Sequence, residues 1–179
     1  MLARVVYESM FGNTAAIAQA ISEGMGRYAT VEILDVATAA DAAAAPVDLL
    51  VVGAPTHAFG LSRRRTRCDA AGRTTAPVTV DIGVREWLDA AFTVPTGSRA
   101  AAFGTKAAAP SWLPGSAARG VAKRLRRLGY RLADDPMDFL VTDVTGPLVD
   151  GELQRARAWA ERLVSYELAR VAHPSETGQ

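Results

Sequence analysis

The segment from Ser9 to Thr14 reads SMFGNT and directly follows an apolar run. Its hydroxyl and amide side chains can donate hydrogen bonds, and Gly12 lets the backbone turn tightly against an anion. If a helix begins here, its unpaired N–H groups and the positive end of its dipole point into the same turn. Such a turn can bind a phosphate without lysine or arginine. The other interpretation is that Asn13 or Thr14 simply caps the helix, which does not exclude phosphate binding.

Segments typical of strands and helices alternate along the whole chain. Residues 2–7 (LARVVY) form a Val-rich run that predicts a buried strand, and Ile17, Ile21 and Met25 recur at helical spacing after Thr14. By the same patterns, strands are predicted at 31–36, 48–53, 99–104 and 139–142, with an edge piece at 130–132, and helices at 66–71, 84–91, 116–128 and 151–170, with one or two helical turns at 41–45.

This alternation predicts an α/β fold, a three-layer doubly wound sandwich in which parallel strands are joined by right-handed crossovers. Ligands bind such sheets outside the carboxyl ends of the strands. The loops after the first, third and fourth strands are therefore the candidates for a binding site.

The composition is that of one ordinary globular domain, predicted over residues 1–170 with a polar tail at 171–179. The chain has 179 residues, of which 49% are hydrophobic and 22% charged, and its net charge is +1. This balance implies neither nucleic-acid binding nor attraction to a membrane surface. No stretch has the apolar length needed for membrane insertion, and the N-terminus lacks a signal-peptide layout, so a cytoplasmic location is expected.

The chain contains little that points to metal or nucleophilic chemistry. Cys68 is the only cysteine, which excludes an intrachain disulfide and a cysteine metal cluster, and we interpret it as a small packing residue on a short helix. Asp134, Asp135 and Asp138 lie in one stretch without histidine or cysteine, which indicates a solvated turn. We assign no catalytic residue.

Two motifs together resemble the flavodoxin family. Y-x-S-x-x-G-N-T ends the first strand (Tyr7 to Thr14), and G-x-P-T-H-x-x-G ends the third (Gly53 to Gly60). The first motif is neither a P-loop nor a G-x-G-x-x-G turn. The resemblance covers residues 2–168 and implies a five-stranded parallel sheet in the order 2-1-3-4-5 with bound FMN where the strand order reverses, a rule for which flavodoxin is the standard example. The chain has no room for the strand-five insertion of long-chain flavodoxins, so it is similar to the short-chain type.

The resemblance also implies which residues contact FMN. The phosphate would be held by Ser9, Met10, Phe11, Gly12, Asn13 and Thr14, with Met10 and Phe11 acting through their backbone N–H groups. The flavin ring would lie against Pro55, Thr56, His57, Ala58, Phe59 and Gly60 on one side and Gly104, Thr105, Lys106 and Trp112 on the other.

This chain departs from the family at several of these positions. Phe11 stands where the family often has threonine, and His57 where many members have tryptophan. The imidazole of His57 either contacts the flavin or hydrogen-bonds its own loop. Trp112 either stacks on the flavin or anchors its loop, and Lys106 is either near the flavin or solvated. The loop at 105–115 contains no acidic residue.

A dense positive cluster follows the expected flavin loop and comprises Arg63, Arg64, Arg65 and Arg67. Such a run is usually a solvated loop. Beside a redox site, however, it suggests docking of a redox partner protein with an acidic face, such as a ferredoxin, or of a phosphate-bearing donor such as NADPH. Flavodoxins are typically acidic and dock on basic reductases, so this nearly neutral chain is expected to differ in its partners.

The sequence thus predicts an FMN-binding, flavodoxin-like electron-transfer protein that carries electrons between redox partners. One alternative is a flavodoxin-fold NAD(P)H or quinone oxidoreductase, which would need a second substrate site beside the flavin. The long connection at 54–81 could build one. A further alternative is an interaction module of the same fold that binds no flavin, consistent with Phe11 and the acid-free loop at 105–115.

Overall fold

The computed structural model describes residues 1–42, 45–57, 59–108 and 115–173. A parallel sheet forms the middle layer, with the strand order β2-β1-β3-β4-β5 and with β6 also paired to β4. The strands are β1 (Leu2–Tyr7), β2 (Thr30–Asp35), β3 (Leu49–Pro55), β4 (Arg99–Ala107), β5 (Arg131–Leu132) and β6 (Met137–Val141). The predicted α/β class, sheet and strand order are confirmed.

Two short strands share the fifth position of the sheet. The nine-residue β4 pairs with β5 through Arg99 and Ala100 and with β6 from Phe103 to Ala107. Pro136 lies between β5 and β6 and has no N–H to donate to a sheet ladder, so it interrupts the pairing. The edge piece predicted at 130–132 and the strand predicted at 139–142 are therefore both present, and they belong to the same edge.

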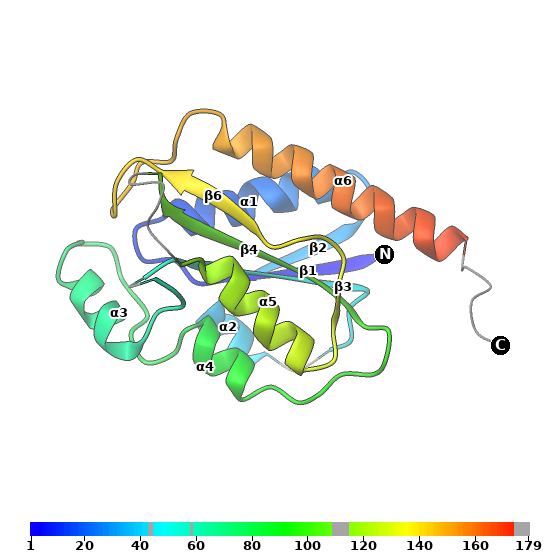
Figure 1. The fold of residues 1–179 in the computed structure, drawn as a ribbon, viewed down its shortest axis with the longest axis horizontal. Helices are drawn as coiled ribbons and strands as arrows, with labels where there is room; N and C mark the ends of the chain where they lie inside the picture. The colour runs from blue at the N-terminus through cyan, green and yellow to red at the C-terminus, as the bar shows by residue number, and fades with distance from the viewer. Residues whose placement is uncertain (43–44, 58, 109–114, 174–179) are drawn as a thin grey trace.

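Helices cover both faces of the sheet (Figure 1). The helices α1 (Asn13–Met25) and α6 (Glu152–Ala172) cover one face, and α2 (Val36–Asp41), α4 (Val84–Asp89) and α5 (Ala117–Arg127) cover the other. The helix α3 (Arg64–Ala71) stands apart from both layers, near the carboxyl ends of the strands (Figure 1). Within the described residues, no helix is both long and apolar enough to span a bilayer.

The period-two alternation of the strands divides the core between the two faces. Val5 packs with α1 and α6, whereas its neighbour Val6 packs with α2, α4 and α5. On the first face, the rings of Phe103, Phe139 and Trp159 meet edge to face, with centroids 6.4 and 6.2 Å apart. Truncating an aromatic side chain buried in this way costs about 3–5 kcal/mol of stability.

Some predicted element boundaries are wrong. The helical turns expected at 41–45 lie earlier, at Val36–Asp41, because the Asp35 carboxylate accepts hydrogen bonds from the N–H groups of Ala37 and Thr38 and so starts the helix. Residues 43–44 lie outside the described residues. The helix α4 ends at Asp89, before the predicted end at 91, and α6 extends to Ala172, into the segment expected to be a tail.

Candidate functional site

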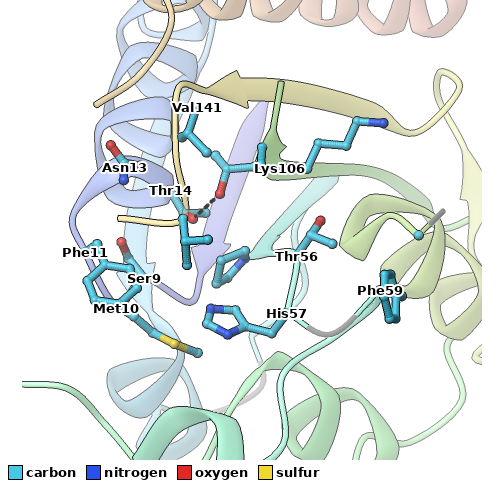
Figure 2. Close-up of a pocket in the computed structure, with 15 residues that line it drawn as sticks. Ser9, Met10, Phe11, Asn13, Thr14, Thr56, His57, Phe59, Lys106 and Val141 are labelled. Atoms are coloured by element: carbon cyan, nitrogen blue, oxygen red, sulfur yellow. Dashed lines mark hydrogen bonds between the residues drawn. The ribbon is translucent and has the colours of Figure 1, made fainter. Parts of the chain in front are cut away.

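A cavity of about 280 Å³ lies at the carboxyl ends of the strands, where the three candidate loops meet (Figure 2). Eleven of the residues predicted to contact FMN line it, from all three loops. They are Ser9, Met10, Phe11, Asn13, Thr14, Pro55, Thr56, His57, Phe59, Thr105 and Lys106. Among these predicted residues, Ser9 and Lys106 are the furthest apart in the sequence, by 97 positions, and the sheet brings them to one cavity.

The loop after β1 enters α1 through Gly12, which has a φ of 85°. This left-handed conformation is open to glycine and costs other residues energy. A Cβ built on Gly12 would meet no atom within 4 Å, so the position is constrained by its backbone angle rather than by space. Because Gly12 itself is the N-cap and no side chain caps α1, the interpretation that Asn13 or Thr14 caps the helix is wrong.

The polar side chains of this loop include one buried hydroxyl that accepts and donates no hydrogen bond within the described residues. The Oγ atom of Ser9 is buried and has no hydrogen-bond partner among the described residues. The Oγ1 atoms of Thr14 and Thr105 lie 2.8 Å apart, so one of these hydroxyls keeps a hydrogen for another acceptor. Asn13 donates from Nδ2 to the carbonyl of Thr145 (3.0 Å).

These features fit a bound phosphate. The first N–H groups of a helix have no partner within the helix, and the positive end of the dipole adds to their attraction for an anion. The first turn of α1 contains no acidic residue that could occupy this position. A buried, unpartnered hydroxyl costs free energy until an acceptor reaches it, and a phosphate oxygen at this helix start would supply that acceptor.

The second loop turns back on itself directly after β3. His57 and Gly60 exchange two backbone hydrogen bonds of 2.8 and 3.0 Å. Phe59 has a φ of 71° and a side chain that is 57% exposed at the cavity. The hydroxyl of Thr56 accepts a hydrogen bond from the N–H of Ala117 (3.0 Å), which ties the loop to the start of α5. Ala58 lies outside the described residues.

The imidazole of His57 points into the cavity (Figure 2). Burial lowers its pKa, and the positive charge of Arg73 lowers it further. The ring is therefore neutral at neutral pH, with one nitrogen as donor and the other as acceptor. It can thus hydrogen-bond a polar group in the cavity without adding charge.

The third loop contributes less than expected. Thr105 is buried beside Thr14, and the ammonium group of Lys106 lies 3.9 Å from Asp138 Oδ2. Gly104 does not line the cavity, because it packs against α5: a Cβ there would lie 2.9 Å from the backbone nitrogen of Ala118. Its predicted flavin contact is therefore not supported by the lining of this cavity. Trp112 lies outside the described residues.

The predicted solvated turn of acidic residues is also wrong in part. Asp138 belongs to β6, is only partly exposed, and accepts a hydrogen bond from Ser116 Oγ (2.9 Å) at the start of α5. Asp134 is exposed, yet its Oδ2 atom accepts a hydrogen bond from the indole of Trp159 (2.8 Å). Both carboxylates therefore contact parts of the chain that are distant in the sequence.

Besides Gly104, the other two predicted glycines also lie outside the cavity lining, and four residues line it without having been predicted. Gly12 adjoins a second cavity of about 290 Å³, on the β2 side of the loop, and Gly60 only closes the turn from His57. The added lining residues are Ala107, Gly115, Val141 and Val144. They are small or apolar and carry no chemical signal, although Val141 follows from the pairing of β6 with β4.

Two predictions about the exposure of residues on α3 are wrong. Arg67, expected to dock a partner, is 0% exposed and donates to the Val80 carbonyl (2.9 Å), to Ser62 Oγ (2.9 Å) and to Glu86 Oε2 (3.1 Å). Cys68, expected to pack inside, is exposed. The reason is that the inner side of α3 faces a buried polar cluster.

That cluster reaches the first loop through Glu8, which is buried beside Ser9 in the sequence. The Glu8 carboxylate accepts hydrogen bonds from Ser62 Oγ and from the N–H of Val84 (2.9 Å). Burial raises the pKa of Glu8, and these hydrogen bonds and the charge of Arg67 oppose the shift. Arg67 therefore positions the loops around the cavity and is unavailable to a partner.

The remaining arginines of the predicted docking cluster are exposed. Arg64 pairs with Asp81 across 3.3 Å, with both side chains in solvent. Arg63 and Arg65 flank it on the surface at the start of α3. These three residues stay available for docking.

No family model and no curated protein matches the sequence. Solved structures do match the fold. A flavodoxin from the domain Archaea is 21% identical, with a TM-score of 0.61, over 94% of this chain and 99% of that one. Flavodoxin 2 from Bacillus cereus is 16% identical, with a TM-score of 0.66, over 92% and 99%. A flavone reductase is 11% identical, with a TM-score of 0.59, over 97% of this chain and 65% of that one.

At these identities the likeness concerns the fold alone. The matches to flavodoxins cover nearly the whole of both chains, and the strand order is the one that the two sequence motifs imply. The resemblance predicted from Y-x-S-x-x-G-N-T and G-x-P-T-H-x-x-G is therefore confirmed at the level of architecture: the chain has the flavodoxin-like fold, and several of its neighbours among solved structures are flavodoxins.

Proposed function

We propose that this chain binds FMN in the cavity at the carboxyl ends of the strands and carries electrons between redox partners. The observation that supports this most is the start of α1. There, a left-handed Gly12 and a buried, unpartnered Ser9 hydroxyl meet a helix terminus that has no acidic residue of its own. A phosphate at this position would satisfy the Ser9 hydroxyl, and it would lie at the edge of a cavity lined by both polar and apolar side chains.

Different residues of the cavity would contact different parts of FMN. Ser9, Thr14 and the N–H groups that open α1 would bind the phosphate. Phe11 and Met10 supply apolar surface, and the second loop supplies the neutral His57 and the exposed ring of Phe59. The bound flavin supplies one- and two-electron chemistry, while the protein binds it, orients it and limits its contact with water. No side chain is required as a nucleophile or as a general acid.

A second candidate is an oxidoreductase of the same fold. The likeness to a flavone reductase spans 97% of this chain, which favours this candidate over an interaction module without flavin. An oxidoreductase would reduce a small acceptor at the expense of NAD(P)H in repeated turnovers, whereas a carrier would need partner proteins for both half-reactions.

The test begins with the purified protein. We expect it to be yellow, or to become yellow on reconstitution with FMN, and to release FMN on denaturation. We then expect only slow NAD(P)H oxidation with a quinone acceptor. Rapid steady turnover with NAD(P)H and the quinone would establish the oxidoreductase instead. A folded protein that takes up no flavin from excess FMN would refute the proposal in both forms.

A further inference from the structure

The exposed arginines and the cavity belong to one continuous stretch of chain. The turn formed by residues 57–60 carries the exposed Phe59, and only Gly60, Leu61 and Ser62 separate Phe59 from Arg63. The helix α3 that follows stands near the carboxyl ends of the strands, outside both helix layers (Figure 1). Charges at its start are therefore close to the mouth of the cavity.

Positive charge dominates this surface. Arg63, Arg64, Arg65, Arg73 and Arg119 are all exposed, and Arg119 precedes Gly120, which packs against Leu61 of the same loop. Among the residues that the structure describes, no carboxylate lies within 4.0 Å of any of them except Asp81 near Arg64, and an ion pair so exposed is weak. The charge of Arg73 lowers the pKa of His57, after the larger effect of burial, so the field of this surface reaches into the cavity.

Two arginines on the inner side of the loop form hydrogen bonds to Leu61 and Ser62, between Phe59 and Arg63. Arg85 donates to the carbonyls of Leu61 (2.7 Å) and Ser62 (2.9 Å), and the buried Arg67 donates to the hydroxyl of Ser62. A surface loop fixed in this way loses little conformational entropy when a partner binds. The segment that leads into the exposed arginines of α3 is therefore already ordered before a partner binds.

The exposed ring of Phe59 gives the charged surface an apolar centre. Its backbone φ of 71° is uncommon for a residue with a side chain, and such angles persist where the surrounding structure imposes them. Gly115 packs so closely that a Cβ there would lie 2.2 Å from the carbonyl oxygen of Phe59, which holds the turn from the other side. Aromatic and arginine side chains are the residues enriched at the energetic centres of protein interfaces.

We infer that Phe59, Arg63, Arg64, Arg65, Arg73 and Arg119 form a docking surface for an electron-transfer protein that presents acidic side chains around its own redox centre. The inference rests on the proposed function, because the bound FMN would be the electron acceptor: one electron leaves the partner's centre and enters the flavin. A protein partner suits this surface better than a nucleotide, because the arginines are distributed over the start of α3, the residue after its C-cap and the first turn of α5, and none of them lines either of the two cavities.

The test compares two charge-reversed variants with the same change in net charge. Arg63→Glu/Arg65→Glu places acids at the start of α3, where the helix dipole favours them, so folding is preserved. The control, Arg27→Glu/Arg162→Glu, reverses two exposed arginines on the α1 and α6 layer. The probe is a reduced, acidic [2Fe–2S] ferredoxin, and stopped-flow absorbance gives its second-order rate constant with the FMN-loaded protein.

We expect the wild-type rate constant to fall as the ionic strength rises from about 0.01 to about 0.5 M. At low salt, Arg63→Glu/Arg65→Glu should lower it about tenfold or more and reverse its salt dependence, while the control changes it less than about twofold. With basic cytochrome c as the electron acceptor, the wild type should show the opposite salt dependence. Equal effects of the two variants, or a wild-type rate that rises with salt toward ferredoxin, would overturn the inference.

Two further measurements separate this inference from the proposed function. FMN affinity is measured for each variant, and a protein that binds no FMN would refute the proposed function alone. Affinity for oxidised ferredoxin, measured by thermophoresis without electron transfer, tests the surface directly, and it should fall about tenfold in Arg63→Glu/Arg65→Glu. If this variant instead loses affinity for NADPH and keeps its affinity for ferredoxin, the arginines form a nucleotide site and the docking inference is wrong.

Discussion

Helices α1 and α6 both begin at a glycine in the left-handed region, with φ 85° at Gly12 and 87° at Gly151. Neither glycine has an atom within 4 Å of the position that a Cβ would take, and no side chain caps either helix. In α6, Glu152 places a carboxylate in the first turn, where it accepts hydrogen bonds from the N–H of Leu140 and from Arg155. In α1, the first turn contains no acid.

The same backbone geometry therefore opens both helices, but only α6 has a negative charge of its own at the helix start. The start of α6 is completed by the chain itself, with negative charge at the positive end of the dipole and the carboxylate's hydrogen bonds satisfied. The start of α1 receives no such charge from the chain, and the Ser9 hydroxyl beside it has no partner among the described residues, as expected for the proposed phosphate site. The difference teaches that a glycine at a helix start predicts a binding site only when the chain provides no anion of its own.

The most direct test of the difference between the two helix starts is the pair of variants Gly12→Val and Gly151→Val. Each forces a β-branched residue to adopt a positive φ, so each should lower the free energy of unfolding by about 1–3 kcal/mol. Only Gly12→Val should also abolish FMN binding, with a loss of affinity of about a hundredfold or more, because the loop must rearrange. Urea unfolding and fluorescence titration with FMN measure the two effects. Similar loss of FMN affinity in both variants would contradict a special role for α1.

Ser9→Ala sharpens the comparison by removing the unpartnered hydroxyl. The buried Oγ has nothing to bond in the protein alone, so the variant should be as stable as the wild type or slightly more so. Its affinity for FMN should fall by about 2 kcal/mol, because a hydrogen bond to a charged acceptor is lost. Cys68→Ser is the control, since its exposed side chain should affect neither quantity. A variant that lost stability while retaining FMN affinity would show that Ser9 is structural.

Asn13→Asp makes α1 resemble α6 by placing a carboxylate at the first position of the helix. The negative charge should repel the phosphate and lower FMN affinity by about 1 kcal/mol. Stability should change little, because the favourable dipole interaction offsets loss of the hydrogen bond from Asn13 to Thr145. Titrations at low and high salt check the electrostatic origin, since screening should shrink the effect. An unchanged affinity at low salt would place the phosphate elsewhere.

Glu152→Gln makes α6 resemble α1 and should have the smallest effect. Removal of the charge from the helix start and from its pair with Arg155 should cost about 0.5–1 kcal/mol of stability at neutral pH. FMN affinity should not change. Thermal unfolding of the flavin-free protein and a flavin titration give the two values, and weaker FMN binding in this variant would show that the two helix starts are coupled.

Several features could be predicted because they depend on neighbours in the sequence. The run from Leu2 to Tyr7 and the spacing of Ile17, Ile21 and Met25 contain their own period, so β1 and α1 follow from it. The placement of the first and second loops at one cavity follows equally, because parallel strands bring their carboxyl ends to one edge.

The predictions that are wrong concern residues whose burial depends on distant parts of the sequence. Nothing local indicates that Arg67 is buried, because its partners Val80 and Glu86 lie 13 and 19 residues away. Cys68 is exposed because the neighbouring arginine occupies the inner side of α3. Gly104 likewise packs against α5 and does not line the cavity, and α5 comes from a later part of the chain.

The sequence by itself therefore determined the period of each element, the alternation that makes a doubly wound sheet, and the glycine-bearing loop that can hold an anion. These depend on local sterics and on hydrophobic spacing, which are complete within a few residues. Only the tertiary structure decided that Ser9 is buried without a partner, that Arg67 is enclosed and that Phe59 and its neighbouring arginines face outward. Burial and hydrogen-bond satisfaction depend on which segments meet in space, and that meeting becomes known only once the layers are assembled.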